Sequence, residues 1–230
     1  MNQLGVSTIG RELLDDPQAD PARVRTSLGN IQRANRWLGG NSAIRFGLGR
    51  LLPFPADRPL TLLDVGTGAG DVPLMLAEWA RRRGIALRPM GLERSWTAAR
   101  LAAATGVPLI HGCGGALPVG DQAVDLVVVS QLAHHLDPAG CIALFREADR
   151  IARHGVVVAD LRRAPLAGVG FRVAGRLLRF DDDTLRDGVI SLRRGFTSGR
   201  LARLLEEAEI KGARVYHRPG ARLVASWRRS

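Results

Sequence analysis

Residues 62–71 read "LLDVGTGAGD", and this stretch decides the fold. Three glycines stand at every second position, Gly66, Gly68 and Gly70, directly after an apolar run that contains Asp64. Glycine permits a tight turn and lets a ligand lie against the backbone. A glycine loop has this function when it follows a strand and opens a helix. We therefore expect a ligand at the carboxyl end of this strand.

Short apolar runs alternate with helical patterns after this loop. The runs are "LTLLDV" at 60–65, "RPMGLE" at 88–93, "VPLIHG" at 107–112, "AVDLVVVS" at 123–130 and "GVVVAD" at 155–160. This alternation predicts a parallel sheet with helices on both faces. Two further runs, "ARVYH" and "ARLVASW", are separated by only "RPG" and must pair antiparallel.

The chain divides into three parts by sequence pattern. Residues 1–55 predict a helical appendage, in which Asp20 caps a helix that begins at Pro21. A further short helix is expected over about 43–52. Residues 56–230 carry the alternating pattern of a Rossmann-like domain. An arginine-rich segment at about 161–195 interrupts the alternation and predicts a helical lid.

The composition is that of a soluble globular protein, with a strong excess of positive charge. Hydrophobic residues make up 46% of the 230 residues, and the net charge is +11. Nearly all cations are arginines, which favours an anionic partner or simply reflects a genome of high GC content. Cys113 and Cys141 are too far apart for a CxxC motif, so no metal site is expected. Without a signal-peptide pattern or a long apolar run, we expect a cytoplasmic location.

The charges near the loop favour a cationic ligand without phosphate. Asp64 and Asp71 would both oppose a bound pyrophosphate, and the loop is one residue shorter than the dinucleotide fingerprint. Glu93 ends the next strand, where a carboxylate can accept the hydroxyls of a ribose. S-adenosyl-L-methionine combines a ribose and an adenine with an ammonium and a sulfonium. We therefore expect this cofactor and not a nicotinamide dinucleotide.

Three motifs in this order resemble the class I S-adenosylmethionine-dependent methyltransferases: "LLDVGTGAG", "GLE" and "GGALPVGDQAVDLVVVSQLAHHL". The similarity covers about residues 60–160 and points most to the branch that methylates small molecules, including quinone rings. It implies a doubly wound α/β fold with a mostly parallel seven-stranded sheet whose last strand is antiparallel. The cofactor-binding residues that it implies are Asp64, Gly66, Thr67, Gly68, Gly70, Glu93 and Arg94.

One position departs from the family pattern. Members often place an aspartate four residues before the Leu-Pro of the loop after the third strand, where it accepts from the adenine amino group. This chain has Cys113 there. We therefore expect backbone groups of Cys113 and Gly114 to recognise the adenine.

The fourth strand ends at Ser130, followed by Gln131 and the pair His134 and His135. Ligands of open α/β sheets lie outside the carboxyl ends of the strands, so Ser130 is a further candidate for the cofactor site. His134 is the candidate catalytic residue, since histidine can accept a proton from a phenol near neutral pH. The alternative is that the two histidines only cap or pack the following turn.

The lid segment contains an amphipathic pattern. Its apolar residues on one helical face are Leu166, Val169, Val173, Leu177 and Phe180. We expect this face to cover an apolar acceptor, so that Val173→Asp would stop turnover. A basic amphipathic helix could instead make peripheral contact with a membrane surface, or pack on the sheet with a solvated arginine face.

Three functions compete on this sequence. The first is methyl transfer to a small, largely apolar acceptor with a phenolic or polyketide-like hydroxyl. The second is C-methylation of a quinone-like ring. The third is RNA methylation or RNA binding, which the charge favours but the scarcity of aromatic residues opposes. Oligomeric state has no sequence signal here.

Overall fold

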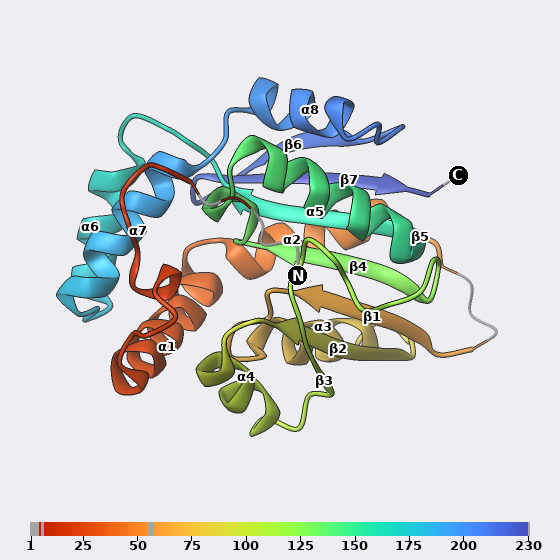
Figure 1. The fold of residues 1–230 in the computed structure, drawn as a ribbon, viewed down its shortest axis with the longest axis horizontal. Helices are drawn as coiled ribbons and strands as arrows, with labels where there is room; N and C mark the ends of the chain where they lie inside the picture. Colours follow the sequence, from red (N-terminus) through yellow and green to blue (C-terminus); the bar gives the residue numbers. More distant parts are fainter. Residues whose placement is uncertain (1–4, 6, 55–57, 230) are drawn as a thin grey trace.

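The computed structural model describes residues 5, 7–54 and 58–229. A seven-stranded sheet runs through the centre of the molecule in the order β3-β2-β1-β4-β5-β7-β6, and helices flank it (Figure 1). β7 runs antiparallel to its neighbours β5 and β6, whereas β1 to β5 pair in parallel. The strands are β1 Leu60–Val65, β2 Leu87–Glu93, β3 Leu109–His111, β4 Val124–Ser130, β5 Ala152–Leu161, β6 Arg214–Arg218 and β7 Arg222–Arg228. The predicted fold class is confirmed.

The central strands are apolar on both faces because helices cover both. Residues that alternate along the strands divide between two cores: Val127 and Val129 of β4 face one, and Leu126 and Val128 face the other. The first core is closed by α5 Pro138–Ile151 and α8 Ser198–Glu207, and the second by α2 Gly40–Arg50 and α3 Asp71–Arg81. α4 Trp96–Ala103 packs beside β2 and β3.

The N-terminal helices join the sheet in different ways. α1 Pro21–Trp37 begins at the predicted cap, where the Asp20 carboxylate accepts from the amides of Ala22 and Arg23. α2 begins earlier than predicted, after Gly39 in the left-handed region, and its Ile44 is fully buried against the sheet. The division that we propose at residue 55 is therefore one of sequence organisation, since α2 shares a core with the sheet.

The order of the strands leaves a crevice at one place along the edge of the sheet. β1 pairs with β2 on one side and with β4 on the other, and β4 pairs with β5, so the connections after β1 and after β4 leave in opposite directions. The loops at the carboxyl ends of β1 and β4 consequently diverge and leave a crevice, which is where open α/β sheets bind ligands. Both candidate motifs, the glycine loop and the segment with the two histidines, follow these strand ends.

The predicted lid consists of two helices, α6 Ala167–Leu177 and α7 Asp182–Arg194, and α6 lies at the edge of the molecule (Figure 1). The expectation for its apolar face was wrong. Leu166, Val169, Val173 and Leu177 are 77%, 60%, 59% and 80% exposed, and only Phe180 is buried. The opposite side of α6 packs on α7, because its glycines allow close approach: a Cβ at Gly175 would lie 2.5 Å from Leu185.

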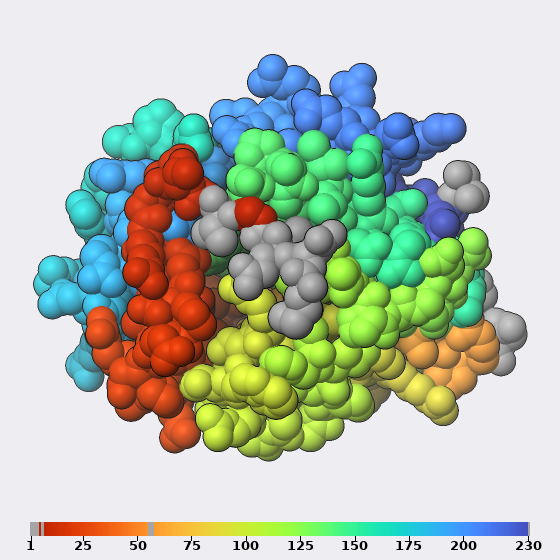
Figure 2. All heavy atoms as spheres, in the orientation of Figure 1, coloured from red at the N-terminus to blue at the C-terminus, as the bar shows by residue number. Residues whose placement is uncertain are grey.

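A buried arginine fastens the N-terminal segment onto α7. The Arg194 guanidinium donates to the carboxylates of Glu12 at 3.0 Å and Asp15 at 2.7 Å, and to the carbonyls of Ile9 and Gly10. Figure 2 shows this segment, in red, lying along the helices of the lid, in blue. Burial alone would raise the pKa of Asp15, but hydrogen bonds from His135 and Arg194 outweigh it and hold that pKa below its usual range. The segment is thus held by charge as well as by packing.

No helix in the described part of the chain is both long and apolar enough to cross a membrane.

Replacing Arg194 tests this fastening. Arg194→Met keeps the length of the side chain but leaves Glu12 and Asp15 without their cationic partner, so we expect the free energy of unfolding to fall by about 3–5 kcal/mol. Urea denaturation measures it. The matched control is Arg193→Met, because Arg193 is the exposed neighbour on the same helix. Equal losses in both variants would contradict the assignment.

Candidate active site

A single cavity of about 730 Å³ occupies the crevice at the carboxyl ends of the strands. Such a volume suits a nucleoside cofactor together with a small second ligand. Its floor is formed by the strand ends and the glycine loop. Its cover is formed by the N-terminal segment, α1 and the two lid helices. Segments far apart in the sequence therefore enclose one space.

The glycine loop takes the backbone form that the sequence predicts. Gly66, Gly68 and Gly70 all have positive φ, at 77°, 57° and 81°, a region that disfavours side chains. A Cβ at Gly66 would also lie 3.0 Å from the Leu132 side chain, which belongs to the other candidate motif. Gly66, Thr67 and Gly68 line the cavity. Gly70 is the exception: it lies outside the cavity wall and forms the left-handed N-cap of α3.

Asp64 places an unpaired carboxylate in the cavity wall. The residue is 1% exposed, and neither of its carboxylate oxygens has a hydrogen-bond partner among the described residues. Burial raises the pKa of Asp64 to about 7, and the negative charges of Asp71 and Glu93 act in the same direction while the Thr67 hydroxyl opposes it. A buried acid without a partner is costly. The ammonium of S-adenosylmethionine would supply the missing partner, so these residues fit the cofactor.

Glu93 is held at the second strand end by backbone amides. Its carboxylate accepts from the amide of Gly68 at 2.9 Å and from those of Arg94 and Ser95 at 2.8 Å each. A carboxylate has about four acceptor positions, so one remains for a ribose hydroxyl while the amides keep the side chain in place. The hydrogen bond from Gly68 also links Glu93, the residue expected to bind the ribose, to the glycine loop.

The remaining predicted cofactor residues lie around the same space. Arg94, Cys113, Gly114 and Ser130 all line the cavity. Cys113 forms a bridge with Ala116 in the loop after β3, and a Cβ at Gly114 would lie 3.0 Å from Leu144. The loop therefore approaches the core closely, and its backbone faces the cavity at the position proposed for adenine.

His134 lies in the cavity wall with an acid behind it. Its Nδ1 is 2.6 Å from Oδ1 of Asp160, the last but one residue of β5, and both side chains are buried. Burial would raise the pKa of Asp160, but the charge of and hydrogen bond from His134 lower it overall. An ionised Asp160 holds the proton on Nδ1. Nε2 of His134 is buried and has no partner among the described residues.

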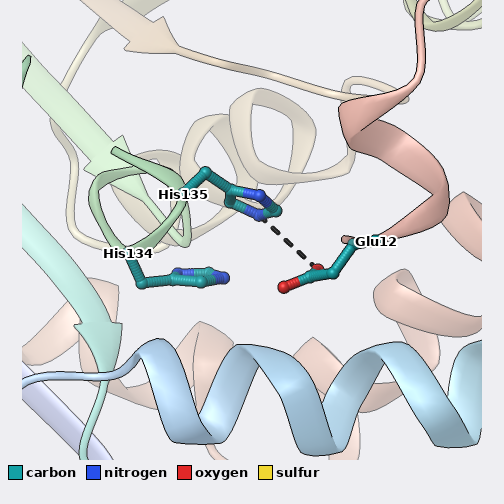
Figure 3. Close-up of side chains that lie close together, drawn as sticks. All are labelled: Glu12, His134 and His135. Atoms are coloured by element: carbon teal, nitrogen blue, oxygen red, sulfur yellow. Dashed lines mark ion pairs between the residues drawn. The ribbon is translucent and has the colours of Figure 1, made fainter. Parts of the chain in front are cut away.

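His135 belongs to the network that closes the cover. Glu12, His134 and His135 lie together beside α7, with His135 Nε2 3.8 Å from the Glu12 carboxylate (Figure 3). These three side chains offer ligand atoms within 4.8 Å of one another, as a metal site would. Arg194, however, already contacts both Glu12 and His135 with its positive charge. We therefore interpret the cluster as an ion-pair network around Arg194.

The sequence did not reveal several residues of this site. Asp160 had a signal, because it ends the run "GVVVAD" as Glu93 ends "RPMGLE". Glu12, Asp15 and Arg194 had none, since the arginine is about 180 residues from its partners. Arg222, buried at the start of β7, also lines the cavity and donates to the Gln131 side chain at 2.7 Å.

Residues 63–159, which contain the carboxyl ends of β1 to β4, match the family model of methyltransferase domains. The match covers the glycine loop, Glu93 and His134. A search of curated protein sequences finds no significant match.

Solved structures with the same fold include three methyltransferases. A SAM-dependent methyltransferase from Aquifex aeolicus is 16% identical, with a TM-score of 0.60 over 92% of this chain and 99% of that one. Human N-acetylserotonin methyltransferase in complex with SAM is 13% identical, with a TM-score of 0.68 over 96% of this chain and 59% of that one. Magnesium protoporphyrin IX methyltransferase from Synechocystis PCC 6803, with bound SAH, is 13% identical, with a TM-score of 0.55 over 90% and 87%. At these identities the similarity establishes the fold.

The matched domain and the shared fold support an S-adenosylmethionine-dependent methyltransferase as the enzyme class. The predicted enzyme class and cofactor are confirmed at this level.

The unpaired carboxylate of Asp64 predicts pH-dependent cofactor binding. The ionised form pairs with the ammonium, so affinity for S-adenosylhomocysteine, which carries the same ammonium, should fall as the pH drops below about 7, by up to about tenfold per unit. Asp64→Asn should bind at least about tenfold more weakly at pH 8 and lose this dependence. Isothermal calorimetry over pH 5.5–8.5 measures both.

The same substitution should stabilise the empty protein. The pKa of Asp64 is raised from 3.8 to about 7 in the folded state, so stability is lost as the pH rises from about 4 towards 7 and stays lost above it. Asp64→Asn removes that loss, and its melting temperature at pH 8 should exceed the wild-type value. Asp121→Asn, at an exposed site, is the control. A pH profile shared by all three proteins would refute the role of Asp64.

Glu93→Ala should weaken binding of S-adenosylhomocysteine by about 1–3 kcal/mol, because it removes a charge-assisted acceptor and strands three backbone amides. Calorimetry measures the affinity, and circular dichroism checks the fold. Glu78→Ala, at a partly exposed glutamate of α3 outside the cavity wall, is the control. Unchanged affinity in a folded Glu93 variant would move the ribose contact elsewhere.

Proposed function

We propose that this enzyme methylates a hydroxyl of a small, largely apolar acceptor, of phenolic or polyketide-like type. The observation that carries the proposal is His134 in the cavity wall, whose buried Nε2 has no partner among the described residues and whose Nδ1 is bonded to Asp160. A histidine oriented in this way is suited to take a proton from a hydroxyl. The same pair would also be compatible with a purely structural turn, so the experiment below separates the two roles.

The residues assigned to the cofactor lie on one side of the cavity. Asp64, Gly66, Thr67 and Gly68 would hold the methionine part, Glu93 and Arg94 the ribose, and Cys113 and Gly114 the adenine. Ser130 follows at the end of β4, between these groups and His134. Bound S-adenosylmethionine would supply a methyl group bonded to a sulfonium sulfur. That sulfur leaves as a neutral thioether, so it is already a good leaving group.

The other side of the cavity is suited to an apolar acceptor. Apolar side chains from the N-terminal segment, α1, the turn with the two histidines and the lid line it: Leu14, Leu38, Leu132, Leu136, Phe171 and Leu192. The acids there are already paired, Glu12 and Asp15 with Arg194 and Asp160 with His134. An acceptor is thus held by shape and apolar contact, with few polar groups to orient it.

The protein itself contributes three things to the reaction. It aligns the reacting groups, excludes water and provides one proton acceptor. The cover excludes water and holds the acceptor hydroxyl in line with the methyl carbon. His134 Nε2 accepts the hydroxyl proton as the oxygen–carbon bond forms and the carbon–sulfur bond breaks. Asp160 keeps the ring oriented and stabilises the imidazolium that results. No further group is needed to balance the step.

Arg222 is a buried cation in the wall and is not part of an ion pair among the described residues. Burial lowers its pKa to about 10, and the charge of Asp160 opposes that change. Its Nε has no hydrogen-bond partner among the described residues. Arg222 is therefore suited to contact a second oxygen of the acceptor, which a polyketide-like phenol would offer.

Two alternatives follow from the same cofactor chemistry. C-methylation of a quinone-like ring needs the same cavity and is separated from O-methylation by the product. RNA methylation is disfavoured because the cavity is closed over by the N-terminal segment and the lid, whereas a base would need a strand-sized entry.

Replacing His134 separates catalysis from structure. With labelled S-adenosylmethionine and 5-pentylresorcinol, a phenol with an alkyl tail, His134→Ala should lower kcat by about 10²–10⁴-fold while affinity for S-adenosylhomocysteine stays unchanged. The loss should shrink with a nitro-substituted phenol, which ionises without a base. A purely structural histidine would cost the same with both phenols. Mass spectrometry and NMR of the product distinguish a methoxy group from a ring methyl group, and transfer RNA as acceptor should take up no label.

A further inference from the structure

The outer face of α6 exposes a continuous apolar stripe. Leu166, Val169, Val173 and Leu177 follow at spacings of three and four residues, and each is more than half exposed. Four large aliphatic side chains in one row are unusual on a surface, where such residues normally occur singly. The stripe lies on the helix at the edge of the molecule (Figure 1).

The inner face of the same helix is apolar as well. Ala167, Phe171 and Ala174 line the cavity, and Gly175 is buried against α7 and Phe180. A helix that is apolar on both sides is normally buried on both sides. In this molecule the inner side is covered and the outer side is not, so the outer stripe needs a covering partner.

Arginines frame the stripe. Arg172 and Arg176 each precede a stripe residue by one position and so lie about 100° round the helix, beside it. Arg163 and Arg179 are exposed just before and after the helix. Among the described residues, only Arg176 of these four lies near an acid, Asp182 at 3.9 Å. The positive charge beside the stripe is therefore largely unneutralised.

We propose that α6 docks this enzyme on an anionic lipid bilayer, with the stripe in the acyl boundary and the arginines among the headgroups. An apolar row flanked by unpaired arginines matches the chemistry of such a surface. A second copy of the chain fits less well, because a symmetric contact would bring the same arginines together in a protein of net charge +11. The proposal depends on the outer face alone and holds whatever the cavity methylates.

The consequence is an entry route. One helix would touch the bilayer with its outer side and the acceptor cavity with its inner side. An acceptor with a lipid tail could then pass from the membrane into the cavity around α6 without crossing water.

Vesicle sedimentation tests the docking. Wild-type protein should sediment with vesicles of equal parts phosphatidylcholine and phosphatidylglycerol, and far less with phosphatidylcholine alone. Val173→Asp should weaken binding at least about tenfold, the scale of losing one buried aliphatic side chain. Arg172→Gln with Arg176→Gln should weaken it about fivefold per charge, and only on the anionic vesicles. Leu74→Asp, at an exposed leucine of α3, is the matched control and should bind as wild type.

Three further readouts make the result decisive. S-adenosylhomocysteine affinity should be unchanged in every variant, which shows that each is folded. Turnover of a water-soluble phenol should also survive Val173→Asp, since that side chain points away from the cavity. Wild-type protein that ignores anionic vesicles, or binding that Val173→Asp does not change, would overturn the proposal. Sedimentation velocity showing a dimer that Val173→Asp dissociates would assign the stripe to a second copy instead.

Discussion

The pairing of β1 with β4 determines where the cavity and its cover must lie. Because the chain leaves these two parallel strands in opposite directions, their carboxyl ends cannot be covered by their own connections. The glycine loop after β1 and the histidine turn after β4 therefore lie on either side of this crevice. They approach each other closely at one point, where a Cβ added to Gly66 would lie 3.0 Å from the Leu132 side chain. A cover from elsewhere in the chain is then required, and the N-terminal segment, α1 and the lid provide it.

The acids of the cavity divide into two groups by their partners. On the cofactor side, Asp64 is buried and unpaired, and Asp71 nearby has its pKa raised by burial. On the acceptor side, Glu12 and Asp15 are paired with Arg194, and Asp160 with His134. A cationic ligand is therefore stabilised on one side only. In the proposed assignment, this asymmetry would orient a molecule that carries an ammonium and a sulfonium, and would leave the other side for an uncharged one.

The sheet and the cofactor motifs were predictable because their signals are local. An apolar run that ends in an acid, followed by glycines, specifies a strand, a loop and a ligand within ten residues, as at Asp64 to Gly70. For the cover, the sequence predicted the helices but not the contacts that hold them in place. Arg194 reaches Glu12 across the length of the chain, and no pattern near either residue shows it. Gly70 shows a finer limit, since the same residue type lines the cavity at Gly66 and caps a helix four residues later.

The face of α6 was misjudged for a physical reason. Helical periodicity finds an apolar stripe but not the direction in which it points, and the usual assumption is that the larger apolar side faces inward. In α6 the inward side is built from glycine, alanine and Phe171, because close packing on α7 leaves no room for larger side chains, as the 2.5 Å approach at Gly175 shows. The large aliphatic residues are displaced to the outside. A helix with small residues on its inner side and large apolar residues on its outer side is expected when its apolar partner lies outside the protein.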